Sequence, residues 1–327
     1  MSVINKRKQN GVALITVLMI LAIMVTVAAT MTGRLTLSLK RTEGLTFSQK
    51  VYWYGQASAD LGRMILDQDF ADSDVVSLDQ IWATPDMVFP LDNGNLAGQI
   101  KDQRSCFNVN AIALADQGNS PALPVTQFRA LLEAIGLTDY SAETIAESTR
   151  DWIDKDDQSD ASQGAEDSTY EGRSVAYLAA NALMVDISEL RAVQGVGKNV
   201  YEKISPYLCA LPSVDQKINV NTVSVDQPEI LYALFKKGHN IALSDFKKLL
   251  QDRPTSGWNS VNAFLENSLF KGISVSATLK KQLSVSSEFF QLNGLVAFED
   301  RLLAVKLLFK ISSKKAKVIR YQSGGFK

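Results

Sequence analysis

The stretch G-V-A-L-I-T-V-L-M-I-L-A-I-M-V-T-V-A-A-T-M-T-G, residues 11–33, contains no charged side chain. Its length suits one crossing of a bilayer by an α-helix, and the first charge after it is Arg34. Lys6, Arg7 and Lys8 precede it as in a secretory signal peptide, but the apolar run is too long for an ordinary signal. Because basic residues flank both ends, the positive-inside rule does not fix the orientation. We therefore predict a transmembrane helix over residues 12–33.

The helix is expected to continue beyond this run. One face of an amphipathic helix follows, with side chains at alternating steps of four and three residues: Phe47, Val51, Tyr54, Ser58, Leu61 and Ile65. A short basic leader that ends in a glycine before such a helix resembles the type IV pilins and pseudopilins. The resemblance implies that a prepilin peptidase removes residues 1–11, cutting between Gly11 and Val12, and that the new N-terminus is methylated. A plain N-terminal anchor with a fortuitous glycine is the alternative.

The bulk composition narrows the class of protein. The chain has 327 residues, a net charge of −1 and 46% hydrophobic residues, enough for two globular domains and too polar for a polytopic membrane protein. The balanced charge gives no sign of a nucleic-acid partner. His239 is the single histidine, so a calcium-dependent envelope hydrolase, our least favoured class, would have to act through it. We therefore expect a protein that is not an enzyme.

An acidic segment interrupts this balance. Residues 150–171 hold eight acidic and two basic side chains, so the segment carries a charge of −6. Carboxylates separated by short polar residues, with Gly164 for a turn, are hard oxygen ligands on a bendable loop, and they suit calcium better than zinc. The segment is not an EF-hand, because Ser159 stands where the glycine of that loop would be. A solvated acidic loop without a metal is the alternative.

The rest of the chain alternates between strand-like and helical segments. Strands are expected at residues 97–103, 284–292, 301–311 and 317–321, the last two joined by a hairpin. Between them, helices are expected at residues 125–136, 141–153, 228–237, 242–251 and 260–269. The two N-V-N segments, residues 108–110 and 219–221, are predicted to be neighbouring strands of one sheet, with a helical block inserted between them.

Two further features belong to the inserted block. Cys106 and Cys209 flank it, and an even pair in an oxidising compartment indicates a disulfide, with two buried free thiols as the alternative. Gly195 and Gly197 form the G-h-G turn of a helix-hairpin-helix, which in DNA-binding versions holds phosphate. Since the nearby segment is acidic, we expect a tight helix pair without nucleic acid, and keep a membrane-anchored nucleic-acid-binding module as the alternative function.

Several motifs in order resemble the general secretion pathway protein K family, the large minor pseudopilins of the bacterial type II secretion system. They are D-W-I-D-x-D (151–156), G-A-E-D-x-x-Y (164–170), Y-L-A-A-N (177–181), I-S-E-L-R-A-V-Q-G-V (187–196), P-Y-L-C-A-L-P (206–212) and I-N-V-N-T (218–222). The resemblance implies an α+β pseudopilin fold: a long N-terminal helix on an antiparallel sheet, with a large inserted all-α domain that contains a helix-hairpin-helix-like (SAM-like) pair. The expected boundaries are 34–112 for the pseudopilin helix and first strands, 113–212 for the inserted domain and 213–327 for the remaining pseudopilin region.

The resemblance also implies a cofactor, partners and a location. The family's α-domain carries calcium, and the motif positions transfer to five expected ligands: Asp151, Asp154, Asp156, Glu166 and Asp167. Asp157 and Asp160 are weaker candidates. The expected partners are the I and J pseudopilins, with H as a further candidate, and the prepilin peptidase. The expected location is the inner membrane, crossed once, with the globular part in the periplasm.

Thr16 is the fifth residue of the predicted mature chain, where most pilins and pseudopilins carry glutamate. The glutamate is thought to meet the N-terminal amine of a neighbouring subunit, and a buried carboxylate needs such a partner. A threonine hydroxyl bonds instead to its own helix and makes no such demand. We therefore expect this subunit to occupy the tip of the pseudopilus, where it initiates or caps assembly. A tolerated helix residue in an ordinary subunit is the alternative.

Overall fold

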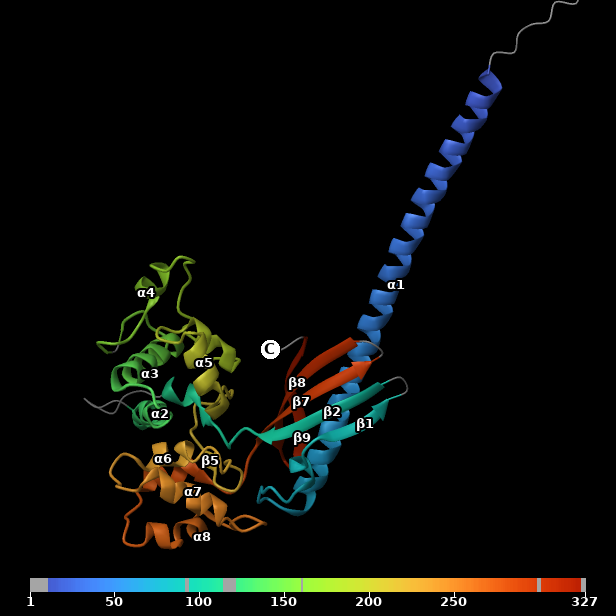
Figure 1. Ribbon diagram of the computed structural model, residues 1–327. Coiled ribbons are helices and arrows are strands. Elements are labelled where there is room, and N and C mark those ends of the chain that lie inside the picture. The colour runs from blue at the N-terminus through green and yellow to red at the C-terminus, as the bar shows by residue number, and fades with distance from the viewer. Residues whose placement is uncertain (1–10, 92–93, 114–121, 160, 299–300, 325–327) are drawn as a thin grey trace, which may run out of the picture. The chain divides into compact units, whose positions relative to one another are not determined.

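The computed structural model describes residues 11–91, 94–113, 122–159, 161–298 and 301–324 (Figure 1). The chain divides into two compact units, Met1–Ala57 and Ser58–Lys327. Beyond Gly11, the described part of the first unit belongs to helix α1 (Val12–Asp72), which runs on into the second unit. Within the described residues, α1 is the one helix long and apolar enough to cross a membrane. The predicted long apolar helix is therefore confirmed.

The second unit contains a five-stranded antiparallel sheet in the order β1-β2-β7-β8-β9. Its strands are β1 (Met87–Leu91), β2 (Gly94–Asp102), β7 (Phe289–Phe298), β8 (Arg301–Ser312) and β9 (Lys315–Gly324). Between β8 and β9, Ser313 and Lys314 have φ values of 51° and 59°, which is the geometry of a tight hairpin turn. The predicted antiparallel sheet and its C-terminal hairpin are confirmed. Strand β1 was not predicted, because Pro90 lies in it; an edge strand tolerates proline.

The last turns of α1 pack on this sheet. Leu66 and Phe70 are buried, and the ring of Phe70 meets that of Phe290 edge-on at 5.5 Å between centroids. A Cβ on Gly62 would lie 2.7 Å from the ring of Phe309, so glycine permits the close approach of helix and sheet. The buried stripe therefore runs through Gly62, Leu66 and Phe70, while the predicted Leu61 and Ile65 lie half-buried at its edge.

Short helices gather at the end of the sheet to which β2 leads (Figure 1). The α-helices are α2 (Leu123–Ala134), α3 (Asp139–Ile153), α4 (Asp167–Glu171), α5 (Lys198–Ile204), α6 (Glu229–Phe235), α7 (Leu243–Gln251), α8 (Val261–Leu265) and α9 (Ala277–Gln282). The 3-10 helices are η1 (Ile81–Ala83), η2 (Val109–Ala113), η3 (Ile187–Ala192), η4 (Ser205–Tyr207) and η5 (Ser268–Phe270). Buried side chains from residues 107–283 form one hydrophobic cluster, so α6–α9 share a core with α2 and α3.

Local signals set the ends of these helices. As predicted, α2 stops at Gly136, which has a φ of 90°. The Gly136 amide donates to the Glu133 carbonyl and the Leu137 amide donates to the Leu132 carbonyl, which together form a Schellman motif. Helix α3 begins earlier than predicted, because the Thr138 side chain caps it by accepting from the Ser141 amide. The predicted helix-hairpin-helix pair consists of η3 and α5, so its first arm is a 3-10 helix rather than an α-helix.

The two N-V-N segments are not neighbouring strands, so that prediction is wrong. The first asparagine of each segment is the last residue of a strand in a separate two-stranded parallel sheet: β3 (Phe107–Asn108) pairs with β4 (Leu208–Cys209), and β5 (Ile218–Asn219) pairs with β6 (Leu283–Ser284). Their asparagines bind loop backbone instead. Asn110 exchanges two hydrogen bonds with the backbone of Met184, both 2.9 Å, and Asn221 does the same with Trp258 at 2.8 and 3.0 Å.

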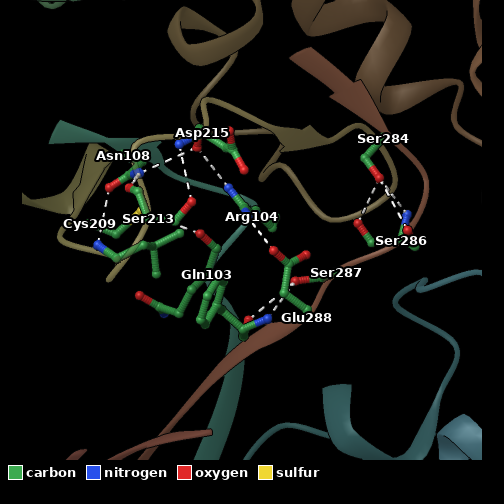
Figure 2. A network of polar contacts seen from close by, with 12 residues as sticks. Gln103, Arg104, Asn108, Cys209, Ser213, Asp215, Ser284, Ser286, Ser287 and Glu288 are labelled. Carbon is green, nitrogen blue, oxygen red and sulfur yellow. Dashed lines mark hydrogen bonds and ion pairs between the residues drawn. The ribbon is translucent and has the colours of Figure 1, made fainter. Parts of the chain in front are cut away.

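A polar network joins the sheet to the helices (Figure 2). The fully buried Arg104 donates to the Asp215 carbonyl at 2.9 Å and to Glu288 at 2.6 Å. Beside it, Cys106 and Cys209 form a disulfide with their Cα atoms 5.8 Å apart. Lys306 of β8 also pairs with Asp186, the N-cap of η3, at 2.7 Å. These contacts fix the point at which β2 leads into the helices.

Candidate metal centre

The acidic segment links two helices. Asp151 lies in the last turn of α3, Asp154 is its C-cap, and Glu166 is the N-cap of α4. The end of α3 and the start of α4 lie close together, so carboxylates twelve and fifteen positions apart along the chain meet in space. One oxygen from each of Asp151, Asp154 and Glu166 lies within 4.8 Å of the others.

Glu166 is the unusual member of this cluster. Its side chain is only 5% exposed, and neither carboxylate oxygen has a hydrogen-bond partner among the residues that the structure describes. Burial, followed by the charges of Asp151, Asp154, Asp167 and Asp156, raises the pKa of Glu166 to about 8. A buried carboxylate without a donor costs stability unless a cation binds it.

The loop is built closely around Asp151. The Asp151 side chain is fully buried, and its Oδ2 accepts a hydrogen bond from the Ser159 hydroxyl at 3.0 Å. A Cβ on Gly164 would lie 2.1 Å from that same oxygen, so only glycine fits at this position. Ser159 was not predicted as part of the site; a hydroxyl in an acidic loop gives no distinctive signal in the sequence.

The other predicted ligands lie outside the compact cluster. Asp156 is exposed and accepts from the Gln158 amide at 3.1 Å. Asp167 accepts from the Ala179 amide at 2.8 Å, and the weaker candidate Asp157 accepts from the Asn181 side chain at 3.0 Å. Asp160 lies outside the described residues. Of the five predicted ligands, the structure therefore brings three together and uses Asp167 to hold the following loop.

The donor set fits a hard divalent cation. Three carboxylates supply oxygen ligands only, which favours calcium or magnesium over zinc or copper. A bound cation would give the two bare oxygens of Glu166 a partner and offset the repulsion among the acids. Asp151, Asp154 and Glu166 are the residues that would hold it, and the Ser159 hydroxyl would orient Asp151.

The raised pKa of Glu166 predicts an unusual pH dependence in protein stripped of divalent cations. Its folded pKa of about 8 lies above the ordinary value of 4.5, so the unfolded chain loses this proton first as pH rises. Metal-free stability should therefore fall by on the order of 2 kcal/mol between pH 5 and pH 7. Urea unfolding at both values, with chelator, measures this. The Glu166→Gln protein should lose that decrease, and an unchanged pH profile in the variant would contradict the assignment.

The remaining predicted site residues lie elsewhere. The Thr16 hydroxyl donates to the Ala13 carbonyl of its own helix at 2.9 Å. Gly11 precedes α1 and Val12 is its first residue, while residues 1–10 of the expected leader lie outside the described part of the chain.

Comparisons with known proteins place the chain in a family. Models of type II secretion system protein K match residues 105–213 and 218–286. A type II secretion system protein K from Aeromonas hydrophila is 38% identical, with 98% of both chains covered. The chain belongs to the type II secretion system protein K family. The relative of that name from Pectobacterium carotovorum is 36% identical, again over 98% of both chains.

A solved structure agrees with this membership. A chain in the crystal structure of the GspK-GspI-GspJ complex from the enterotoxigenic Escherichia coli type 2 secretion system has a TM-score of 0.79 and 36% identity. The match covers 88% of this chain and 100% of that chain. The predicted role as a minor pseudopilin of a type II secretion system is confirmed. The alternative, a nucleic-acid-binding module, has no support from these relatives.

Proposed function

We propose that this protein K family member is the tip subunit of a pseudopilus, which initiates or caps the fibre during export across the outer membrane. The observation that carries the proposal is its likeness, over the full length of that chain, to a chain from a complex named for three pseudopilins. The expected partners are therefore the I and J subunits, with H as a further candidate. The helical block, for which we keep the boundaries 113–212, would enlarge the head and hinder stacking of another subunit above it.

The centre formed by Asp151, Asp154 and Glu166 is proposed to hold calcium, with Asp156 and Asp167 as additional ligands after rearrangement. The bare, buried carboxylate of Glu166 supports this assignment over a solvated loop. Calcium would order the segment between α3 and α4. Asp167 accepts a hydrogen bond from the Ala179 amide, so an ordered Asp167 would also hold the loop beyond α4 in place.

The location is proposed to be the inner membrane, crossed once by the apolar part of α1, with the second unit in the periplasm. The Cys106–Cys209 disulfide supports an oxidising compartment for that unit.

Processing of the N-terminus gives a direct test of the pseudopilin pathway. In cells with the prepilin peptidase, the mature chain should begin at Val12 and carry a methylated amine, because Gly11 directly precedes the apolar helix. Mass spectrometry of the purified protein measures both. The Gly11→Leu variant should keep its leader, whereas the control Gly33→Leu should be processed normally. A mature N-terminus inside the apolar run, for instance near Ala29, would contradict the proposal.

A further inference from the structure

The segment between α4 and η3 exposes apolar side chains to solvent. Residues 174–185 read S-V-A-Y-L-A-A-N-A-L-M-V, include the motif Y-L-A-A-N and carry no charged side chain. Val175, Leu178 and Val185 are 76%, 54% and 61% exposed, and three of the alanines between them are exposed as well. Single exposed apolar residues are ordinary on a protein surface, but several in one short run are typical of an interaction site.

The middle of this segment presents one apolar face. Residues 176–180 run without a turn or bend, and the exposure of their side chains alternates along the chain. Tyr177 and Ala179 are half-buried, whereas Ala176, Leu178 and Ala180 are exposed. This period of two is that of an extended chain with one face on the protein. The face that these residues turn to solvent is therefore entirely apolar.

Contacts along the segment hold it in place. The ring of Tyr177 stacks on that of Tyr170 with 5.3 Å between centroids, and its hydroxyl donates to the Ala192 carbonyl at 2.7 Å. Toward the other end, the Met184 backbone forms its two hydrogen bonds with the Asn110 side chain, both 2.9 Å. A surface fixed in this way loses little conformational entropy when a partner binds.

The surroundings of the segment are acidic. Residues 150–191 carry ten acidic and four basic side chains, a charge of −6, and the two charges of a bound calcium ion would leave −4. The exposed Asp157 accepts from the Asn181 side chain, and the exposed Glu171 ends α4 just before the segment. The neighbouring base, Arg173, lies over a tyrosine ring at 4.9 Å from its centroid. Apolar side chains within a negative field complement a ligand that is both apolar and positively charged.

We propose that residues 174–185 form a docking surface for a segment of a partner protein that combines apolar and basic side chains. Apolar side chains of the partner would cover Val175 and Leu178, and its bases would face Asp157 and Glu171. A negative field repels the anionic surface of a bilayer, so the charge favours a protein over a lipid as the occupant. Because the segment has anchors outside the acidic centre, the inference depends on neither the calcium centre nor the position in the fibre.

The test uses the full chain in phosphatidylcholine nanodiscs, with calcium present, and three fluorescein-labelled octapeptides. The first alternates valine and lysine, the second alternates valine and glutamate, and the third alternates serine and lysine. Fluorescence anisotropy should show binding of the first peptide, at least about ten-fold tighter than of either other peptide. Hydrogen exchange over residues 176–182 should slow by about ten-fold or more when the first peptide binds.

Protein variants locate the surface. Leu178→Ser should weaken binding of the valine–lysine peptide by about ten-fold or more, while Leu302→Ser, at an exposed leucine of β8, should leave it unchanged. Glu171→Lys should weaken binding by about five-fold, while Glu266→Lys, at an exposed residue next to α8, should not. All four side chains are exposed, so an unchanged melting temperature in each variant serves as the control for folding.

Several outcomes would overturn the proposal. They are equal affinity for the valine–lysine peptide and either of the others, unchanged affinity in the Leu178→Ser protein, and exchange that slows elsewhere but not within residues 176–182. Competition by added phosphatidylcholine vesicles would overturn it too, because it assigns the segment to a membrane. Self-association that displaces the peptide would assign the segment to a second copy of this chain and would count equally against the proposal.

Discussion

Adding calcium at about one hundred times its dissociation constant should raise the melting temperature of the chelator-treated protein by roughly 3–5 °C. Binding at that excess stabilises the folded state by about 2.7 kcal/mol. With an unfolding entropy of about 2.1 cal/mol/K per residue, each kcal/mol shifts the melting temperature of a chain of this length by about 1–2 °C. The physical reason is the cluster of Asp151, Asp154 and Glu166, in which the buried Glu166 carboxylate has no donor among the described residues. Differential scanning fluorimetry with and without calcium measures the shift.

The variant Glu166→Gln should abolish this shift, because the amide keeps the shape of the side chain and removes its charge. Glu171→Gln is the matched control, since Glu171 is exposed at the end of the same helix α4. It should retain the whole shift. Coincident melting curves of the unmodified protein with calcium and with chelator would show that the segment is a solvated acidic loop.

Removing the disulfide should cost still more. The Cys106–Cys209 bond closes a loop with a sequence separation of 103 residues. On the chain-entropy account, such a cross-link stabilises the folded protein by about 4–5 kcal/mol. The double variant Cys106→Ser, Cys209→Ser should therefore lose that amount of unfolding free energy in urea, measured with calcium present.

A reductant provides the control for this prediction. It should destabilise the unmodified protein by a similar amount and leave the double variant unchanged. Thiol titration of the denatured, unreduced protein should find no free thiol. Two free thiols per chain in protein taken from the periplasm would contradict the disulfide in the cell.

The parts of the fold that depend on local signals were predicted well. The hairpin of β8 and β9 follows from two alternating runs with a short connection, and α2 follows from its periodicity and Gly136. Strand β1 was missed because Pro90 disfavours a strand unless it lies at an edge, and only the assembled sheet makes it one. Whether a strand lies at the edge of a sheet depends on the tertiary structure, so the five residues of β1 do not by themselves show it.

The error over the N-V-N segments has a similar cause. The repeated motif was taken as evidence of neighbouring strands, but its repetition reflects a shared local role. In each copy, the second asparagine forms two bonds with the backbone of a distant residue, Met184 or Trp258. The sequence does not show which distant backbone segment an asparagine side chain will bind, so the motif alone could not reveal this role.

The geometry of the candidate metal centre was predicted only in part. Charge density and the family motifs pointed to a segment in which the structure brings three carboxylates together. Which carboxylates meet depends on where α3 ends and α4 begins, and this selects Asp151, Asp154 and Glu166. Asp167 is adjacent to Glu166, yet its side chain holds the Ala179 amide instead. Such a competing backbone partner is twelve residues away and gives no signal in the acidic motif itself.

We propose that this subunit sits at the end of the pseudopilus. The Thr16 hydroxyl donates a hydrogen bond to the Ala13 carbonyl of its own helix. The fifth position of the predicted mature chain would therefore need no amine from a subunit ahead of it. A head enlarged by the helical block would in addition obstruct a following subunit.

The most direct measurement is the position of labelled copies along isolated fibres. An epitope added after Lys327 and detected with gold-conjugated antibody can be located by electron microscopy, with the same epitope on the major pseudopilin as the control. We expect label at one end of each fibre for this subunit, at a stoichiometry of one copy per fibre, and label along the whole length for the control. Copies of this subunit distributed along the shaft would contradict the account.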